Sequence, residues 1–213
     1  MCRLDRGTFT LSQYSAIYGV AAVERMTGVP AATIRAWQDR FGQSWGTTGI
    51  GGETLYSRDD VEAILSFSRR QGHEPAGSAD AGPAEPKPGA RLLVLLAERD
   101  EYAAELTEYF LRTEGYAVET VFDADEALRR YEQVEPDLAI VELLIDGGAG
   151  FDLCRRLRAQ GTCPVVAISA LEAGDLVAGE VDALLRKPLA PLALITTVRD
   201  LLGTSAMLGR EDS

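Results

Sequence analysis

Six polar side chains follow apolar stretches in the second half of the sequence, where buried strands are expected to end. They comprise three carboxylates, a hydroxyl and two cations: Glu98, Arg99, Asp100, Glu142, Ser169 and Lys187. Side chains of these types can form an ion-pair network when a fold brings them together. Neither a nucleophile–base pair nor a cofactor-binding loop accompanies them, so the sequence does not indicate an enzyme. We also expect no cofactor and no bound metal.

The elements that must position these residues lie between residues 91 and 203, where apolar strands alternate with amphipathic helices. The predicted strands are 92–97, 117–120, 138–143, 165–169 and 183–185, and the predicted helices are 103–113, 124–133, 151–159, a weak one near residue 175, and 190–202. This alternation predicts an α/β fold, a doubly wound five-stranded parallel sheet. Sites in such folds lie at the carboxyl ends of the strands, so the six side chains should share one rim.

This half resembles the response-regulator receiver domain over its whole length. The similar segments are GYAVETVFDADEAL, PDLAIV and GFDLCRRLR, and Lys187-Pro188 follows the last predicted strand. The resemblance implies a receiver (flavodoxin-like) fold. It assigns Glu142 to the phosphoacceptor position, Glu98-Arg99 to the acidic pair after the first strand, and Ser169 to the end of the fourth strand.

The same resemblance shows three departures from an intact receiver, which uses an Asp nucleophile and an acidic pair that holds Mg²⁺. The extra methylene of Glu142 moves its carboxylate outward by about 1.5 Å, one C–C bond length, which spoils an in-line attack. Arg99 puts a cation where a metal ligand belongs, and Leu184 replaces the usual aromatic residue. We therefore expect a pseudo-receiver.

Two interpretations of the rim stay open. In one, Glu142 stands in for a phosphoryl group and pairs with Lys187, Arg99 takes the place of the metal, and Ser169 hydrogen-bonds the cluster, which locks the domain near its active arrangement. In the other, the cluster is a structural ion-pair network left after phosphorylation was lost. A clustered carboxylate can also have a raised pKa, which allows a proton-operated or ligand-operated version.

The first half predicts two short helices joined by a tight turn. Val20, Val23 and Met26 have helical spacing, Gly28 suits the turn, and the second helix runs over 31–41. That helix is expected to bury the apolar residues Ile34, Trp37 and Phe41. Its other face carries polar residues, Thr33, Arg35, Gln38 and Asp39. Helix, short turn and helix form the helix-turn-helix pattern, in which the second helix enters the DNA major groove.

Residues 18–70 resemble the MerR family of winged-helix regulators, through YGVAAVERMTGVPAATIRAWQDRFG and GGETLYSRDDVEAI. The resemblance implies a mostly helical winged helix-turn-helix domain that binds DNA. The predicted DNA-binding residues are Thr33, Arg35, Gln38, Arg40 and Arg58. Ser57 is the expected N-cap of the helix after the wing, and the two following Asp residues suit its positive end.

The wing departs from the family pattern, because Glu53-Thr54 stands where a Tyr-Arg pair is usual and residues 43–54 contain no basic side chain. Each lost phosphate contact weakens DNA affinity and its salt dependence. Either the three arginines Arg35, Arg40 and Arg58 suffice in a dimer, or this module has turned toward protein contacts. Alternatively, the arginines are simply solvated helix-surface charges.

Composition divides the 213 residues into four parts: 1–71, a flexible Pro/Gly/Ala-rich linker at 72–89, 90–203, and a disordered tail at 204–213. Residues 1–71 hold eight basic and seven acidic side chains, a net charge of +1, whereas residues 90–203 hold eleven and twenty-one, a net of −10. Any nucleic-acid contact must therefore come from a local patch. The charged N-terminus and the absence of a long apolar run predict a cytoplasmic protein without a membrane span.

A dimerisation helix of the MerR type is not expected, since residues 61–71 supply barely three turns before the linker. The receiver resemblance instead points to a homodimer through the fourth helix, fifth strand and fifth helix. Segments 189–195 and 198–202 supply apolar anchors there. A two-fold dimer would present two recognition helices to a pseudo-palindromic site.

The preferred hypothesis is a transcriptional regulator that binds promoter DNA and whose receiver-like domain acts without phosphorylation, in dimerisation or in sensing a signal or protein partner. The alternative is a protein–protein adaptor in which neither domain binds DNA with sequence specificity. The near-neutral first half and acidic second half favour the adaptor, whereas Arg35 and the family pattern favour DNA.

Overall fold

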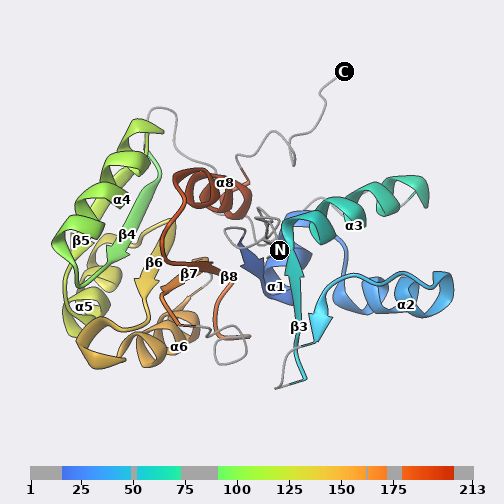
Figure 1. The fold of residues 1–213 in the computed structure, drawn as a ribbon, viewed down its shortest axis with the longest axis horizontal. Helices are drawn as coiled ribbons and strands as arrows, with labels where there is room; N and C mark the ends of the chain where they lie inside the picture. Colours follow the sequence, from blue (N-terminus) through green and yellow to red (C-terminus); the bar gives the residue numbers. More distant parts are fainter. Residues whose placement is uncertain (1–15, 49–51, 73–90, 162, 172–178, 204–213) are drawn as a thin grey trace, which may run out of the picture.

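The structure is a computed structural model, and it describes residues 16–48, 52–72, 91–161, 163–171 and 179–203 (Figure 1). The predicted weak helix near residue 175, most of the predicted linker and the predicted tail lie outside these residues. Among the described residues, no helix is both long and apolar enough to cross a membrane.

The second half contains the five predicted parallel strands: β4 (Leu93–Ala97), β5 (Ala117–Val121), β6 (Leu138–Glu142), β7 (Val165–Ser169) and β8 (Ala183–Arg186). Their order is β8-β7-β6-β4-β5, and all neighbours are parallel. The central strands β6 and β7 are buried at every residue. Because both faces of these strands are buried, their sequences are continuous apolar runs, without alternating apolar and polar residues.

Helices cover both faces of this sheet. On one face lie α4 (Glu101–Thr113) and α8 (Pro191–Leu201), and on the other lie α5 (Ala124–Val134) and α6 (Gly150–Gln160), with a short 3-10 turn, η2 (Ile145–Gly147), before α6. Asp100 and Asp123 cap α4 and α5 by accepting backbone N–H bonds from Ala103 and Glu126. The caps satisfy donors that a helix start leaves open.

The first half contains α1 (Val20–Thr27), α2 (Ala31–Phe41) and α3 (Arg58–Arg70), with short strands β1 (Ile17–Tyr18), β2 (Thr47–Thr48) and β3 (Thr54–Ser57). The predicted second helix is confirmed at both ends. Gly28 closes α1 in the left-handed conformation, with φ of 67°, which favours glycine. Ser57 and Asp60 form a reciprocal capping box at the start of α3.

One prediction about α2 is wrong. Ile34 is fully buried and Trp37 partly so, but Phe41 is 41% exposed. Phe41 is the last residue of α2, beyond the part of the helix that the core covers. Its ring lies 5.4 Å from that of Phe67, and the Arg40 guanidinium lies 5.3 Å from its centroid.

The sheet has eight strands in the order β2-β3-β1-β8-β7-β6-β4-β5, which corrects the prediction of five. β1 pairs antiparallel with both β3 and β8, with Ile17 opposite Ser57 on one side and Leu184 on the other. The reason is that β8 would otherwise be an edge strand with unpaired backbone groups. Two residues of β1 are too few for a sequence pattern to reveal.

The two halves also share one apolar core. Val23 and Ile64 of the first half belong to the same buried cluster as Leu194 and Val198 of α8. Segments 189–195 and 198–202 were predicted to pair two copies, but most of their apolar residues are buried within this one chain. Leu192 differs, because it is 79% exposed.

Two buried carboxylates fasten the halves together. Asp200 of α8 accepts a hydrogen bond from the Tyr18 hydroxyl and pairs with Arg58. Asp182, just before β8, lies 2.9 Å from Nη1 of Arg158 and 3.2 Å from Nη2 of Arg25. Asp182 is 0% exposed and Asp200 is 1% exposed. A buried carboxylate needs such partners to stay charged.

Candidate functional site

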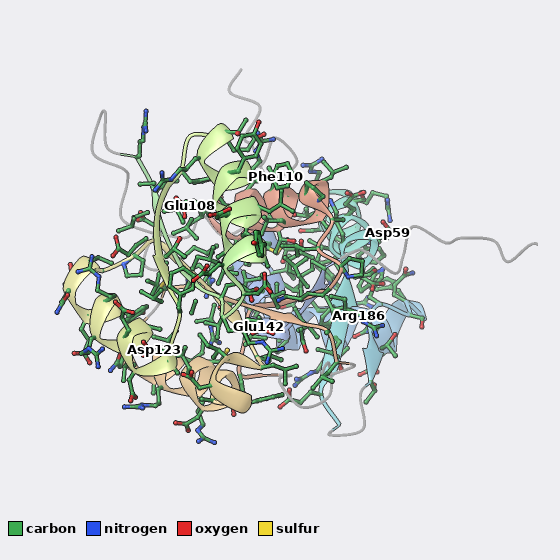
Figure 2. The ribbon with its side chains drawn as sticks, turned by 60° about the vertical axis from the view of Figure 1, so that its left-hand side comes forward. Asp59, Glu108, Phe110, Asp123, Glu142 and Arg186 are labelled. Atoms are coloured by element: carbon green, nitrogen blue, oxygen red, sulfur yellow. The ribbon has the colours of Figure 1, made fainter. Side chains whose placement is uncertain are left out.

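The strand ends bring most of the predicted rim residues together, as the parallel sheet requires. Glu98 directly follows β4, Glu142 is the last residue of β6, and Lys187 follows β8. Figure 2 labels Glu142 in the interior of the molecule, between the helix layers. Glu98 and Glu142 are each only 1% exposed.

Two cations neutralise these two buried carboxylates. Lys187 Nζ lies 2.7 Å from Oε2 of Glu98 and 3.6 Å from Oε1 of Glu142. Arg99 Nε lies 3.3 Å from Oε2 of Glu142 and its side chain is 52% exposed. That Oε2 atom is buried and has no partner in hydrogen-bond geometry, so Arg99 acts on it by charge alone. The predicted pairing of Glu142 with Lys187 is present, and Arg99 lies beside the same carboxylate.

Burial raises the pKa of Glu142, since the carboxylate is poorly solvated there. Glu98 adds to that rise, whereas Lys187 and Arg99 oppose it. The lysine is closer to Glu98 than to Glu142, so it compensates Glu142 incompletely. Desolvation therefore exceeds the attraction of the two cations.

Ser169 and Asp100 do not join this cluster. The Ser169 hydroxyl accepts a hydrogen bond from the backbone N–H of Leu171, at 2.9 Å. It does not make the predicted bond to Glu142 or Lys187. Asp100 serves as the N-cap of α4, and its own backbone N–H donates to Glu98 Oε1 at 3.1 Å. Both residues hold the loops around the rim.

The receiver fold raises the question of Mg²⁺, which needs several hard oxygen ligands. The residues do not fit it. Glu98 is held by Lys187 and by the Asp100 backbone, and the Arg99 guanidinium sits beside Glu142. Among the described residues, no three potential ligands gather into a metal site. The cation beside the Glu142 carboxylate is thus a side chain of this same chain.

The predicted DNA-binding residues divide into two groups in the structure. Arg35 and Arg40 are exposed on α2, and Thr33 is partly buried there. Gln38 instead donates from Nε2 to the backbone carbonyl of Trp45, at 2.9 Å, and Arg58 pairs with Asp200 and Glu62. Gln38 and Arg58 are thus engaged within the chain.

An aromatic cluster explains how α2 is held. The rings of Trp37, Trp45 and Phe41 lie 5.2, 5.3 and 5.4 Å from the ring of Phe67 on α3. Such spacings are typical of stabilising aromatic pairs. Together with the Gln38–Trp45 bond, the cluster fixes α2 against the segment that leads to β2.

Sequence reasoning missed the residues between the halves: Tyr18, Arg25, Asp182 and Asp200. A signal was present for Asp200, which lies among the apolar residues Val198 and Leu201 of an amphipathic helix. Nothing in the sequence identified its partner, because Tyr18 is 182 positions away.

Comparison with known proteins finds one family match in each half of the chain. Residues 94–199 match the family described as "Response regulator receiver domain", and residues 18–69 match "MerR HTH family regulatory protein". The first match thus spans the parallel sheet with its helices, and the second spans α1 to α3.

Individual relatives match the second half. The chain is 33% identical over 113 residues to the DNA-binding response regulator MtrA of Mycobacterium tuberculosis, which is 51% of this chain and 50% of MtrA. It is 32% identical over 117 residues to the sensory transduction protein RegX3 of Mycolicibacterium smegmatis, which is 53% and 51%. The chain thus spans about half the length of the curated relatives it matches.

Solved structures are similar to the same half. A response regulator receiver domain protein (CheY-like) from Methanospirillum hungatei superposes with a TM-score of 0.51 at 22% identity, over 54% of this chain and 95% of that one. This likeness establishes the receiver-type fold of the second half.

Proposed function

We propose, from a receiver domain joined to a MerR-type helix-turn-helix region, that this chain is a DNA-binding transcriptional regulator whose receiver domain works without phosphorylation. In this proposal α2 contacts promoter DNA, and the receiver supports homodimerisation or senses a signal or protein partner in the cytoplasm. The chain regulates rather than catalyses.

The position of α2 supports DNA binding. In Figure 1, α2 and α3 lie at the opposite side of the molecule from α4 and α5, so the receiver does not cover α2. Arg35 and Arg40 are both exposed on it. An exposed helix that carries arginines is suited to enter the major groove and to contact phosphates.

The ion pairs of Glu142 support the second part of the proposal, that the receiver domain works without phosphorylation. A phosphoacceptor must be free to attack in line and needs a metal beside it. Here the longer Glu142 side chain is already paired with Lys187 and Arg99. The arrangement favours a fixed ion-pair cluster over a site that is phosphorylated and dephosphorylated in turn.

DNA binding is tested by titrating the full chain with the fragment upstream of its own gene at about 50 and 200 mM salt, beside Arg35→Ala. We expect sequence-selective binding that Arg35→Ala abolishes. Each phosphate contact should cost about threefold in affinity over that salt range. Binding that is absent even at low salt would contradict the proposal.

Phosphorylation independence is tested with an acyl phosphate and Mg²⁺. We expect no labelling of the wild-type chain and none of Glu142→Asp, because Arg99 and Leu184 are unchanged in that variant. Stable labelling of Glu142→Asp, detected by intact-mass measurement, would show that residue 142 alone disables the site.

A protein–protein adaptor is the second candidate. Gln38 and Arg58 are engaged within the chain, and residues 43–54 contain no basic side chain. Fewer phosphate contacts are then available than in a strongly basic DNA-binding module. The DNA titration separates the two candidates, since an adaptor would show no sequence selectivity.

A further inference from the structure

The exposed side of α2 carries one acidic residue among its basic and small ones. Its exposed residues are Ala32, Arg35, Ala36, Asp39 and Arg40. They are spaced i, i+3, i+4, i+7 and i+8, so they lie on one face of the helix. At about 100° of turn per residue, this face spans an arc of about 140°. We call these five residues the α2 face.

The two arginines lie at opposite edges of the α2 face, and Asp39 lies between them with the two alanines. Arg35 is on the side of Tyr56, because its charge opposes the rise that burial causes in the pKa of the Tyr56 hydroxyl. The Arg40 guanidinium instead lies 5.3 Å from the centroid of the Phe41 ring. The middle of the face is therefore formed by a carboxylate and two short side chains.

The Asp39 carboxylate has no structural role within the part of the chain that the structure describes. No hydrogen bond or ion pair joins it to another described residue, although Arg35 is four positions before it on the same helix. On a helix that enters the major groove, a carboxylate is repelled by the phosphates of both strands. Asp39 therefore opposes DNA binding by α2, except where a base edge offers its carboxylate a hydrogen-bond donor.

We propose that Asp39 selects a cytosine in the target DNA, by accepting a hydrogen bond from the N4 amino group of that base. This inference rests on the proposed function and deepens it, because it requires α2 to lie in the major groove. An ionised carboxylate can only accept hydrogen bonds. In the major groove guanine offers two acceptors and thymine offers one, so both repel it. Adenine offers a donor next to an acceptor, whereas the edge of cytosine offers a donor alone.

The other members of the α2 face are suited to bring Asp39 to the bases. Arg35 and Arg40, at the two edges, face the phosphate walls of the groove, where they offset the repulsion of the carboxylate. Ala32 and Ala36 have short side chains, which allow the helix to approach the base edges closely, and alanine also contacts the methyl group of thymine. The face thus combines phosphate contacts at its edges with base contacts in its middle.

Selection by the full chain from a pool of duplexes with about twenty randomised base pairs, enough for two turns of DNA, tests this role. The wild type should enrich cytosine over guanine about tenfold at one position of the selected site. Asp39→Asn keeps the size of the side chain and adds a donor, so adenine should replace cytosine there, since asparagine pairs with adenine N6 and N7. Asp39→Ala should show no preference at that position.

Asp59→Asn is the matched control. It removes one exposed carboxylate from the same half of the chain, on α3 instead of α2 (Figure 2). This variant should still select cytosine, because only the total charge has changed. All three substitutions are at exposed positions, so each should change the Tm by less than about 2 °C. A change of base preference then reports on the contact and not on folding.

Titrations separate base selection from repulsion. Replacing the selected C·G pair by G·C should weaken wild-type binding about tenfold and that of Asp39→Ala less than about twofold. Asp39→Ala should also bind the G·C copy more tightly than the wild type does, since the repulsion is gone.

Two results would contradict this inference in different ways. If Asp39→Ala strengthened binding to both copies equally, Asp39 would act by repulsion alone and the assignment would be wrong, with the proposed DNA binding intact. If the wild type enriched no sequence at all, the proposed function itself would fail, and the role of Asp39 with it.

Discussion

At the scale of single residues, the rim is governed by two buried carboxylates that share cations. Lys187 reaches both Glu98 and Glu142, and Arg99 reaches Glu142 from the exposed side. Glu142 nevertheless has a raised pKa, with burial as the largest cause. The ionised side chain therefore costs stability at neutral pH, even though it is paired.

This gives a pH dependence with a definite sign. With the folded pKa of Glu142 above its unfolded value, the folded state keeps the proton that the unfolded chain has released. The resulting stability is full below the ordinary Glu range and is lost as pH rises through the raised pKa. We expect the wild type to lose stability relative to Glu142→Gln as pH rises from below the ordinary Glu range through the raised pKa of Glu142.

Urea unfolding of both proteins at several pH values measures this difference. The exposed substitution Glu105→Gln controls for the loss of one charge. If the unfolding free energy of the wild type instead rises relative to that of Glu142→Gln as pH rises, the prediction is wrong. The attraction of Lys187 and Arg99 for the ionised carboxylate then exceeds the cost of burying it.

At the scale of elements, α2 is held by contacts near both of its ends and by an aromatic cluster. Glu24 accepts a hydrogen bond from the first backbone N–H of α2, at Ala31, and Gln38 bonds the Trp45 carbonyl near the other end. Phe67 of α3 supports the aromatic residues between them. Gln38 was predicted to contact DNA, and in the structure it ties α2 to the segment that leads to β2.

Replacing Gln38 tests this role. Gln38→Ala removes a partly buried hydrogen bond, so we expect about 1 kcal/mol lower unfolding free energy and weaker DNA binding with unchanged sequence preference. Gln43→Ala, which removes an exposed bond to Phe41, should cost less than about 0.5 kcal/mol. If Gln38→Ala changed the base preference and left the stability unchanged, the result would instead support a direct contact between Gln38 and DNA.

At the scale of the whole molecule, the two halves form one sheet and share one core. β1 joins β3 to β8, and the buried Asp200 ties α8 to Tyr18 and to the start of α3. Helix α2, which we propose to bind DNA, belongs to a half whose position against the receiver is fixed by the β1–β8 pairing and the shared core. We therefore expect a structural change in the receiver near β8 to alter the position of α2.

Arg58 is the sharpest test of that coupling. Arg58→Ala removes the arginine that pairs with the buried Asp200 carboxylate, and we expect a loss of about 3 kcal/mol with separate unfolding of the two halves. Arg130→Ala, which breaks the more exposed pair with Glu119, should cost at most about 1 kcal/mol. Thermal unfolding followed by calorimetry measures both, and equal losses would show that Asp200 does not fasten the halves.

The sequence by itself determined the parallel sheet, the helices α1 to α3 and the rim of Glu98, Glu142 and Lys187. These follow from local periodicity, turn residues and the rule that parallel strands end on one side. The tertiary structure alone decided that β1 extends the sheet, that Arg58 and Gln38 face inward, and that segments 189–195 and 198–202 serve one chain. Several of these outcomes depend on pairings between residues more than a hundred positions apart, such as Tyr18 with Asp200, and local patterns carry no information about such partners. The partner of Gln38 is only seven positions away, but it is a backbone carbonyl, which no side-chain pattern marks.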